Sequence, residues 1–276
     1  MSAMSMPVNS FYSSIEESLA FFEGAARPPK QCSYASLVYM PPTPLVDFGK
    51  EVWPSPHKKK DVCPRLLLIS NWTDNRFSLI GGNHEAGEDS LAALSREFLE
   101  EMGTEVAFTQ EDYQFSKVQA NAVSHIYGRC TTDLALFEGI LRAFHANRDA
   151  YCDEVISACG LPIWLEGPES SDPEECGWGN NIWGLPRMLS PGGCFKTLGS
   201  DNRDREKVLL LLCKLGVLSR DTLQRVLLLA AGFTSQWPLG GNGNMGQDTN
   251  LSTWEELLAC PGVGAILGVE VPKLGV

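Results

Sequence analysis

The sequence predicts an α/β fold, an α/β/α sandwich in which helices cover both faces of a mixed β-sheet. Short runs rich in β-branched and aromatic residues alternate along the chain with segments of helical periodicity, a pattern typical of layered α/β domains. The length of 276 residues allows one elaborated domain or two small ones. We therefore expect a sheet-centred domain with insertions and a helical C-terminal extension.

The first half of the chain supplies three expected strands. A Pro-rich segment that carries Lys58, Lys59 and Lys60 separates the first two strands, so we expect a long loop there. The third strand ends at Gly81 and Gly82. The expected strands span 34–40, 65–70 and 76–80.

An amphipathic helix is expected over residues 91–102. Asp89 or Ser90 can cap its N-terminus, and Gly103 follows its last apolar residue. Downstream, strands are expected at 104–108, 122–130 and 153–164, and helices at 131–147, 203–215, 219–231 and 252–259.

Two stretches predict irregular structure. Residues 166–194 are polar and rich in Gly and Pro, which predicts an insertion that could act as a lid. Residues 240–247 are rich in Gly and predict a flexible link to the last helix.

Composition limits the kinds of binding partner and the cellular compartments that we expect for this protein. No apolar run approaches the roughly 18–20 residues that a membrane span needs, so we expect no membrane role. The nine cysteines form no C-x-x-C pair, which favours reduced thiols in an intracellular protein, and no targeting peptide is evident. A net charge of −12 disfavours tracking along a nucleic-acid backbone but allows a pocket for one nucleotide or an RNA end.

The residues that indicate a chemical function are closely spaced carboxylates on the helix expected over residues 91–102. Glu97, Glu100 and Glu101 stand three and four positions apart, so they share a helix face with Cβ atoms roughly 5–6 Å apart. Unpaired carboxylates at this spacing repel one another, and a divalent cation removes the repulsion. Oxygen ligands without Cys or His suit Mg²⁺ or Mn²⁺. The alternative is a solvated acidic helix face.

Residues 82–103 are similar to the Nudix box, G-x5-E-x7-R-E-U-x-E-E-x-G-U, where U is a bulky aliphatic residue. Thr104 is the one defined position that differs. The matching residues are Gly82, Glu88, Arg96, Glu97, Phe98, Glu100, Glu101 and Gly103.

The Nudix resemblance implies a role for each matching polar residue. Gly82, Glu97, Glu100 and Glu101 would bind metal, and Arg96 would orient the carboxylates. Bound metal would activate a water for in-line attack on phosphorus, with Glu100 or Glu101 as the general base. In some Nudix enzymes the base lies outside the box, for which Glu154 is the candidate.

The resemblance extends beyond the box to the branch that decaps small nucleolar RNA and hydrolyses inosine diphosphate. It divides the chain into an N-terminal extension at 1–33, a Nudix domain at 34–218 and a C-terminal helical extension at 219–276. The similar segments, in order, are LVYMPP, RFSLIGG, SREFLEEMG, EDYQFSKV, SHIYGR, GLPRML and DREKVLLLLCKLGVL.

This branch implies cleavage of a diphosphate at the 5′ end of RNA or in a purine nucleotide. The chain departs from the branch at its base-binding positions, where Ala35, Leu79 and Lys207 replace a His, an aromatic residue and a Gln. A base could instead stack on an aromatic residue. The candidates for substrate binding are Arg76 and Lys207 for phosphate, Trp72, Phe77, Trp178 or Trp183 for the base, and His125, which could equally be a core histidine.

The leading hypothesis is therefore a Mg²⁺-dependent pyrophosphohydrolase of RNA 5′ ends, which releases pyrophosphate from 5′-triphosphorylated RNA or removes a cap. One alternative is a hydrolase of free nucleoside di- or triphosphates. Another is a weakly catalytic RNA-end-binding subunit that meets a protein partner through its terminal extensions. A narrower resemblance, to kinetoplastid mitochondrial Nudix proteins that stabilise edited mRNA, implies the mitochondrion; otherwise we expect the nucleus or cytoplasm.

Overall fold

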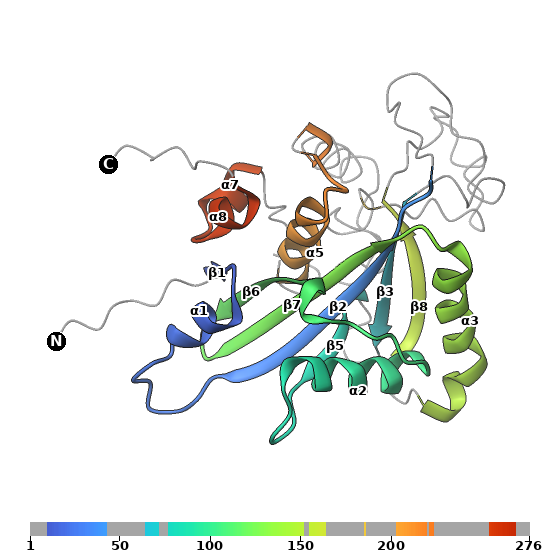
Figure 1. The fold of residues 1–276 in the computed structure, drawn as a ribbon, viewed down its shortest axis with the longest axis horizontal. Helices are drawn as coiled ribbons and strands as arrows, with labels where there is room; N and C mark the ends of the chain where they lie inside the picture. The colour runs from blue at the N-terminus through green and yellow to red at the C-terminus, as the bar shows by residue number, and fades with distance from the viewer. Residues whose placement is uncertain are drawn as a thin grey trace, which may run out of the picture.

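The computed structural model describes residues 10–42, 64–71, 77–151, 155–163, 185, 203–219, 221–223 and 254–268. Within these residues the chain forms a mixed α/β fold around one sheet, as the sequence predicts (Figure 1). The strands of the sheet are β1 (Ser10–Tyr12), β2 (Lys30–Tyr39), β3 (Arg65–Asn71), β4 (Phe77–Ser78), β5 (Ile80–Asn83), β6 (Tyr113–Gln119), β7 (Ala122–Thr131) and β8 (Val155–Pro162).

The sheet divides along β2, its central strand. The strand order is β1-β6-β7-β2-β3-β4, and β8 pairs with β3. On one side, β2 pairs with β7 in parallel over its whole length. On its other side, residues 32–35 of β2 pair with β5 and residues 38–39 pair with β3, both antiparallel. Because β5 and β3 pair with different parts of β2, β5 and its two glycines lie beside the first half of that strand.

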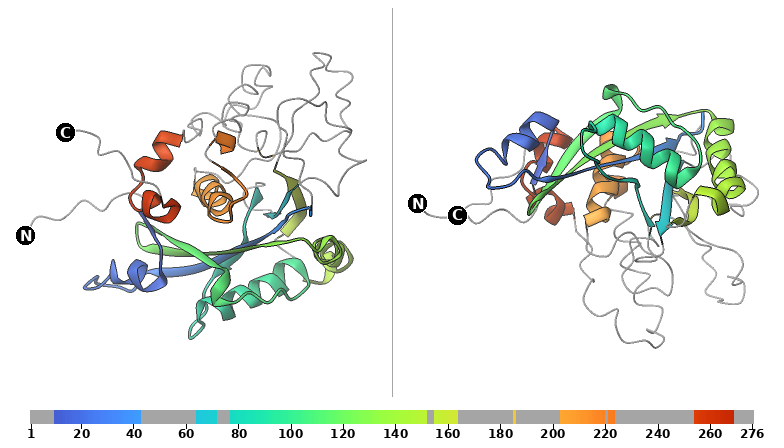
Figure 2. Two further views of the ribbon diagram at one scale, coloured as in Figure 1. Left: turned by 45° about the horizontal axis from the view of Figure 1, so that its top comes forward. Right: turned by 90° about the horizontal axis from the view of Figure 1, so that it is seen from below.

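Helices cover both faces of the sheet (Figure 2). On one face, α2 (Ser90–Met102) and α3 (Leu134–Tyr151) bury one apolar cluster, which includes Leu37, Phe98 and Phe144. On the other, α5 (Arg203–Lys214) and α8 (Val263–Leu267) bury a second cluster, which includes Val38 and Leu211. The remaining helices are α1 (Ile15–Ala20), the short 3-10 helix η2 (Gln110–Asp112) and α7 (Trp254–Ala259).

Helix α2 begins and ends where the sequence predicts. The Asp89 carboxylate accepts hydrogen bonds from the amides of Leu91 and Ala92, and Gly103 ends the helix with a φ of 65°. The buried side chains Ala93, Leu94, Phe98 and Met102 lie on one stripe of the helix. That stripe faces the sheet, so the remaining surface is available for charged residues.

Three predictions for the chain outside α2 need correction. Residues 104–108 form no strand, although Val106 and Phe108 are buried and the Phe108 ring lies 5.1 Å from that of Phe98. Their alternation reflects packing against α2 and not strand pairing. Strands β1 and β6, which pair with each other, were not expected. The expected domain boundary between residues 33 and 34 falls inside β2.

The C-terminal helices pack against the N-terminal part of the chain. The Phe11 amide donates to the Pro261 carbonyl at 2.8 Å, and Lys214 Nζ donates to the Ile266 carbonyl at 3.1 Å. Among the described residues, no helix is long and apolar enough to cross a membrane. The expected lid at 166–194, apart from Leu185, lies outside the described residues, as do the link at 240–247 and most of the helix expected at 219–231.

Candidate metal centre

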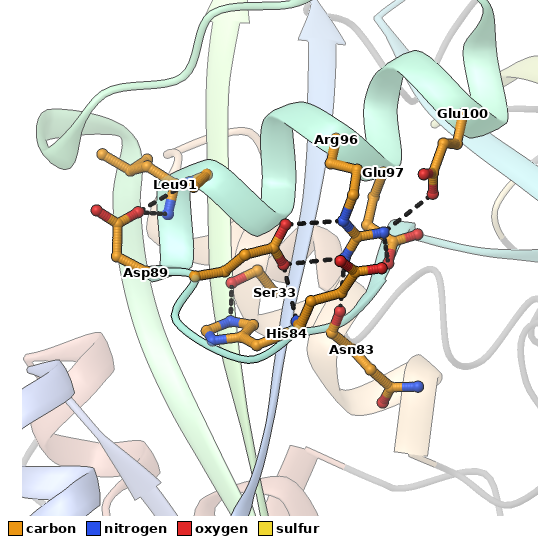
Figure 3. A network of polar contacts seen from close by, with 11 residues as sticks. Ser33, Asn83, His84, Asp89, Leu91, Arg96, Glu97 and Glu100 are labelled. Carbon is orange, nitrogen blue, oxygen red and sulfur yellow. Dashed lines mark hydrogen bonds and ion pairs between the residues drawn. The ribbon is translucent and has the colours of Figure 1, made fainter.

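Arg96 stands at the centre of a polar network between α2 and the loop before it (Figure 3). Its Nε and Nη2 donate to the two oxygens of Glu88 at 2.8 and 3.1 Å. Its Nη1 donates to Glu97 Oε1 at 3.0 Å and to Glu100 Oε2 at 2.9 Å, and its Nη2 also donates to the Asn83 carbonyl at 2.8 Å. One guanidinium therefore fixes three carboxylates and the end of β5 relative to one another.

The Glu88 carboxylate is held from two directions. It accepts from Arg96 and from the Glu85 amide, at 2.8 Å. These hydrogen bonds favour the ionised form and lower the pKa of Glu88 to about 2. The same ion pair raises the pKa of Arg96 above its ordinary value. Both partners are therefore charged at neutral pH, and Glu88 shapes its loop around Arg96.

The two glycines of β5 receive the other carboxylates. A Cβ on Gly82 would lie 2.5 Å from Glu97 Oε1, so the missing side chain leaves the space that this carboxylate occupies. The Gly81 amide donates to Glu101 Oε2 at 2.8 Å. Gly81 has a φ of 135°, and a Cβ there would lie 2.1 Å from the Ser33 carbonyl oxygen. The missing side chain of Gly82 thus lets α2 approach β5, and that of Gly81 lets β5 lie against β2.

Glu97 lies in a less polar environment than its neighbours. Burial raises the pKa of Glu97, while the ion pair with Arg96 opposes the increase. The Glu100 side chain is 56 % exposed, compared with 14 % for Glu97. The two carboxylates therefore differ in access to solvent although both contact the same guanidinium.

The donor set fits a hard divalent cation in chemical type, because it consists of carboxylate and carbonyl oxygens. The arrangement nevertheless differs from the sequence prediction of three unpaired, converging carboxylates. Arg96 pairs with Glu97 and Glu100, and Glu101 accepts from Gly81. Across the described ranges, no three His, Cys, Asp or Glu side chains gather closely enough to hold a metal ion. The prediction overlooked that Arg96 and Glu100 stand four residues apart and form an ion pair.

A fully buried histidine, His125, lies next to half-buried His84, with the ring centroids 5.8 Å apart. His125 Nδ1 lies 2.8 Å from Ser116 Oγ, and its Nε2 lies 3.3 Å from Gln31 Oε1. Burial lowers the pKa of His125 to about 4 and also lowers that of His84. His125 is therefore a neutral histidine of the core at neutral pH.

The remaining substrate-binding candidates separate into buried and undescribed residues. Phe77 is 6 % exposed and packs in the apolar cluster on the α5 side, so its ring is not open to a base. Lys207 is 7 % exposed, and its Nζ lies 4.2 Å from the centroid of the Tyr34 ring. Ala35 and Leu79 are buried. The candidates that lie outside the described residues are Trp72, Arg76, Trp178 and Trp183, together with Glu154, the candidate general base.

Two residues of the network had no assigned role in the sequence analysis. Glu88 was available from the motif, since it occupies a defined position of the box. Ser33, whose Oγ lies 2.8 Å from His84 Nε2, could not be found from the motif. It lies on β2, far from the box in sequence, and the pairing of β2 with β5 brings it to the loop. No periodicity or motif in the sequence indicates that contact.

No protein-family model matches the sequence, and no curated protein matches it. Among solved structures the chain is similar to a MutT/Nudix family protein from Enterococcus faecalis, with 18 % identity and a TM-score of 0.31. This similarity covers 56 % of this chain and 53 % of that protein. At this TM-score the likeness establishes no family.

Two further solved structures give comparable values. An ADP-ribose pyrophosphatase from Streptococcus suis has 11 % identity and a TM-score of 0.26, over 51 % of this chain and 78 % of that protein. A Nudix hydrolase from Nitrosomonas europaea has 15 % identity and a TM-score of 0.24, over 49 % of this chain and 58 % of that protein.

Proposed function

We propose that this chain is a Nudix pyrophosphohydrolase that depends on Mg²⁺ or Mn²⁺. The observation that carries the proposal is the Arg96 network, in which one guanidinium holds Glu88, Glu97 and Glu100. An acidic helix face without function gives no reason for Glu97 to pack on a glycine and for Glu101 to bind the amide of the adjacent glycine. The motif and the contacts point to the same residues.

Each residue of the site has its own role in the proposed reaction. Gly82, Glu97, Glu100 and Glu101 would hold the metal ion. Bound metal neutralises the diphosphate and makes a water more acidic. Arg96 keeps the carboxylates oriented while substrate approaches. Glu100 or Glu101 accepts the proton of the attacking water, and Glu100 is well placed for contact with solvent because its side chain is 56 % exposed.

The proposed substrate class is a 5′ diphosphate on RNA, including the 5′-triphosphate end and the cap. The net charge of −12 supports recognition of one end over binding along a strand. Lys207, on α5, adds a cation beside β2, because its Nζ lies 4.2 Å from the centroid of the Tyr34 ring. Such a cation would bind an anionic group of the substrate that is separated from the cleaved diphosphate.

A substrate that spans the metal centre and Lys207 would need separated anionic groups. A nucleotide chain with a 5′ polyphosphate has them. The mitochondrion as the compartment and a protein partner for the terminal extensions stay predictions.

The test compares Mg²⁺-dependent product release from 5′-triphosphate RNA, capped RNA, GTP, IDP and ADP-ribose. We expect faster turnover of an RNA 5′ end than of any mononucleotide, and loss of that turnover in Glu101→Gln. The matched control is Glu105→Gln, which changes an exposed carboxylate just beyond the helix and should leave turnover unchanged.

Three results would contradict parts of the proposal. Equal turnover of RNA and mononucleotides would favour a hydrolase of free nucleotides. Binding of RNA ends with negligible turnover would favour a non-catalytic subunit. Unchanged activity in Glu101→Gln would remove this residue from the metal centre.

A further inference from the structure

One hydroxyl, that of Ser33, holds both ends of the loop that leads into α2. Ser33 Oγ lies 2.8 Å from His84 Nε2 and 2.7 Å from Ser90 Oγ. His84 is the first residue after β5, and Ser90 is the first residue of α2. Ser33 itself is fully buried in the middle of β2. The loop 84–89 is therefore closed at its base by a residue far away in the sequence (Figure 3).

The contact is part of a longer chain of partly buried hydrogen bonds. The Tyr127 hydroxyl on β7 donates to Ser90 Oγ at 2.8 Å, and Tyr127 is fully buried. The His84 amide donates to the Gln31 carbonyl at 3.0 Å. The loop is thus tied to two neighbouring strands, β2 and β7, at its two ends. A network of satisfied, partly buried hydrogen bonds of this kind fixes one conformation of the segment it holds.

The loop held in this way carries Glu88. Glu88 accepts the bidentate contact of Arg96, and Arg96 orients Glu97 and Glu100. A shift of the loop would move Glu88 and remove two of the five hydrogen bonds that hold the guanidinium. The position of the carboxylates therefore depends on contacts at Ser33, which lies outside the motif and touches none of them in the hydrogen bonds described.

We propose that Ser33 and His84 are positioning residues of the metal centre. Their hydrogen bond fixes the loop 84–89, and through Glu88 and Arg96 it fixes the carboxylates. The inference rests on the proposed function for its chemical consequence, because it assigns to the tether a part of the affinity for the divalent cation. It adds a requirement for β2 that the motif alone does not contain.

The fold offers a matched control on β6, which β7 separates from β2. Ser116 on β6 is also fully buried, and its Oγ also bridges a hydroxyl and an imidazole, those of Tyr113 and His125, both at 2.8 Å. His125 belongs to β7 and not to the loop. Ser33→Ala and Ser116→Ala thus remove the same group from similar surroundings, and only the first releases the loop.

The experiment measures Mn²⁺ affinity by calorimetry, amide hydrogen exchange at Glu85 and Glu88, and the melting temperature of both variants. We expect similar losses of melting temperature. Ser33→Ala should weaken Mn²⁺ binding about tenfold, the lower end of the effect of removing outer contacts of metal ligands, and Ser116→Ala should change it less than about twofold. Exchange at Glu85 and Glu88 should accelerate in Ser33→Ala alone.

A second pair of variants tests the same contact if Ser33→Ala does not fold. His84 is only half-buried, so His84→Ala should fold and show the weaker Mn²⁺ binding. His84→Gln keeps a polar atom near the position of Nε2 and should restore most of the affinity. Equal Mn²⁺ affinity in His84→Ala and the wild type would overturn the proposal.

The two readouts separate this inference from the proposed function. Unchanged exchange at Glu85 and Glu88 in Ser33→Ala overturns the tether, whatever the metal does. Equal effects of Ser33→Ala and Ser116→Ala on Mn²⁺ binding overturn it as well, because the loss would then be general. Failure of the wild-type protein to bind Mn²⁺ contradicts the proposed function, and the exchange result then still decides whether Ser33 holds the loop.

Discussion

Replacing Gly82 by alanine should remove activity while leaving the fold intact. The new Cβ would lie 2.5 Å from Glu97 Oε1, and ordinary contact begins at 3.4 Å, so the carboxylate must retreat by about 0.9 Å. The atoms that move are the far end of a flexible side chain, and Gly82 has no positive φ. A displacement of about 1 Å in a catalytic group can cost about 100-fold in rate.

Stability should change little, although activity falls. Gly82→Ala gains about 0.4–1 kcal/mol because alanine has less freedom in the unfolded chain. It loses about as much from a weakened Arg96–Glu97 ion pair, which is partly exposed and worth at most about 1 kcal/mol. The free energy of unfolding should therefore stay within about 1 kcal/mol of the wild type.

Gly81→Ala supplies the contrast one residue away. A Cβ there would lie 2.1 Å from the Ser33 carbonyl, which is backbone, and the φ of 135° strains any other residue. The strain costs about 1–3 kcal/mol, and the displaced strand adds about 1–3 kcal/mol. A total loss of about 3 kcal/mol should lower the melting temperature by about 6–12 °C.

The assay combines thermal unfolding, followed by circular dichroism, with Mg²⁺-dependent turnover of the best substrate of the panel. Gly82→Ala should melt near the wild-type temperature with turnover reduced about 100-fold. Full turnover in Gly82→Ala would refute the position of Glu97 against Gly82. A fall in melting temperature as large as that of Gly81→Ala would refute the claim that only the carboxylate moves.

Three further predictions follow from single contacts. Arg96→Lys keeps the charge but cannot make the five hydrogen bonds of the guanidinium. Turnover, measured as a function of Mg²⁺ concentration, should therefore fall at least about tenfold. An unchanged Mg²⁺ activation curve would argue against the network. Lys117→Met leaves Glu206 buried without its ion pair, so the free energy of unfolding in urea should fall by about 3–5 kcal/mol, and Glu206→Leu in the same chain should restore most of it. The pKa of His125 is about 4 in the fold and 6.5 in the unfolded chain, so its contribution to stability is complete above pH 6.5 and is lost as the pH falls toward 4. The slope, at most about 1.4 kcal/mol per pH unit, should be smaller in His125→Gln, and an equal slope would assign the titration to other groups.

The sequence predicted elements whose signals are local. The cap at Asp89 and the stop at Gly103 bound α2 because both act through the backbone within one turn. Strand β6 was missed because Lys117 interrupts its apolar pattern. Lys117 is only 1 % exposed and meets Glu206 on α5, a partner far away in the sequence. The short strand β1 belongs to the sheet only through its pairing with β6.

For the candidate site too, the sequence predicted what depends on local spacing and missed what depends on contacts in the fold. Helix spacing put Glu97, Glu100 and Glu101 on one face, and it also places Arg96 four residues before Glu100, a pairing that the prediction left out. The structure shows Arg96 as the common partner of Glu97 and Glu100. The sequence made Phe77 a candidate for stacking on a base, because aromatic side chains occur both in hydrophobic cores and in ligand sites. Its burial in the apolar cluster on the α5 side shows that it belongs to the core.

The most direct test of the account is the Mg²⁺-dependent cleavage of 5′-triphosphorylated RNA by the wild-type chain, by Glu97→Gln and by Glu105→Gln. We predict release of pyrophosphate by the wild type and by Glu105→Gln, and a loss of about 100-fold or more in Glu97→Gln with the melting temperature preserved. Wild-type turnover in Glu97→Gln, or no turnover by the wild-type chain of RNA or of any nucleotide diphosphate with Mg²⁺ or Mn²⁺, would contradict the central claim.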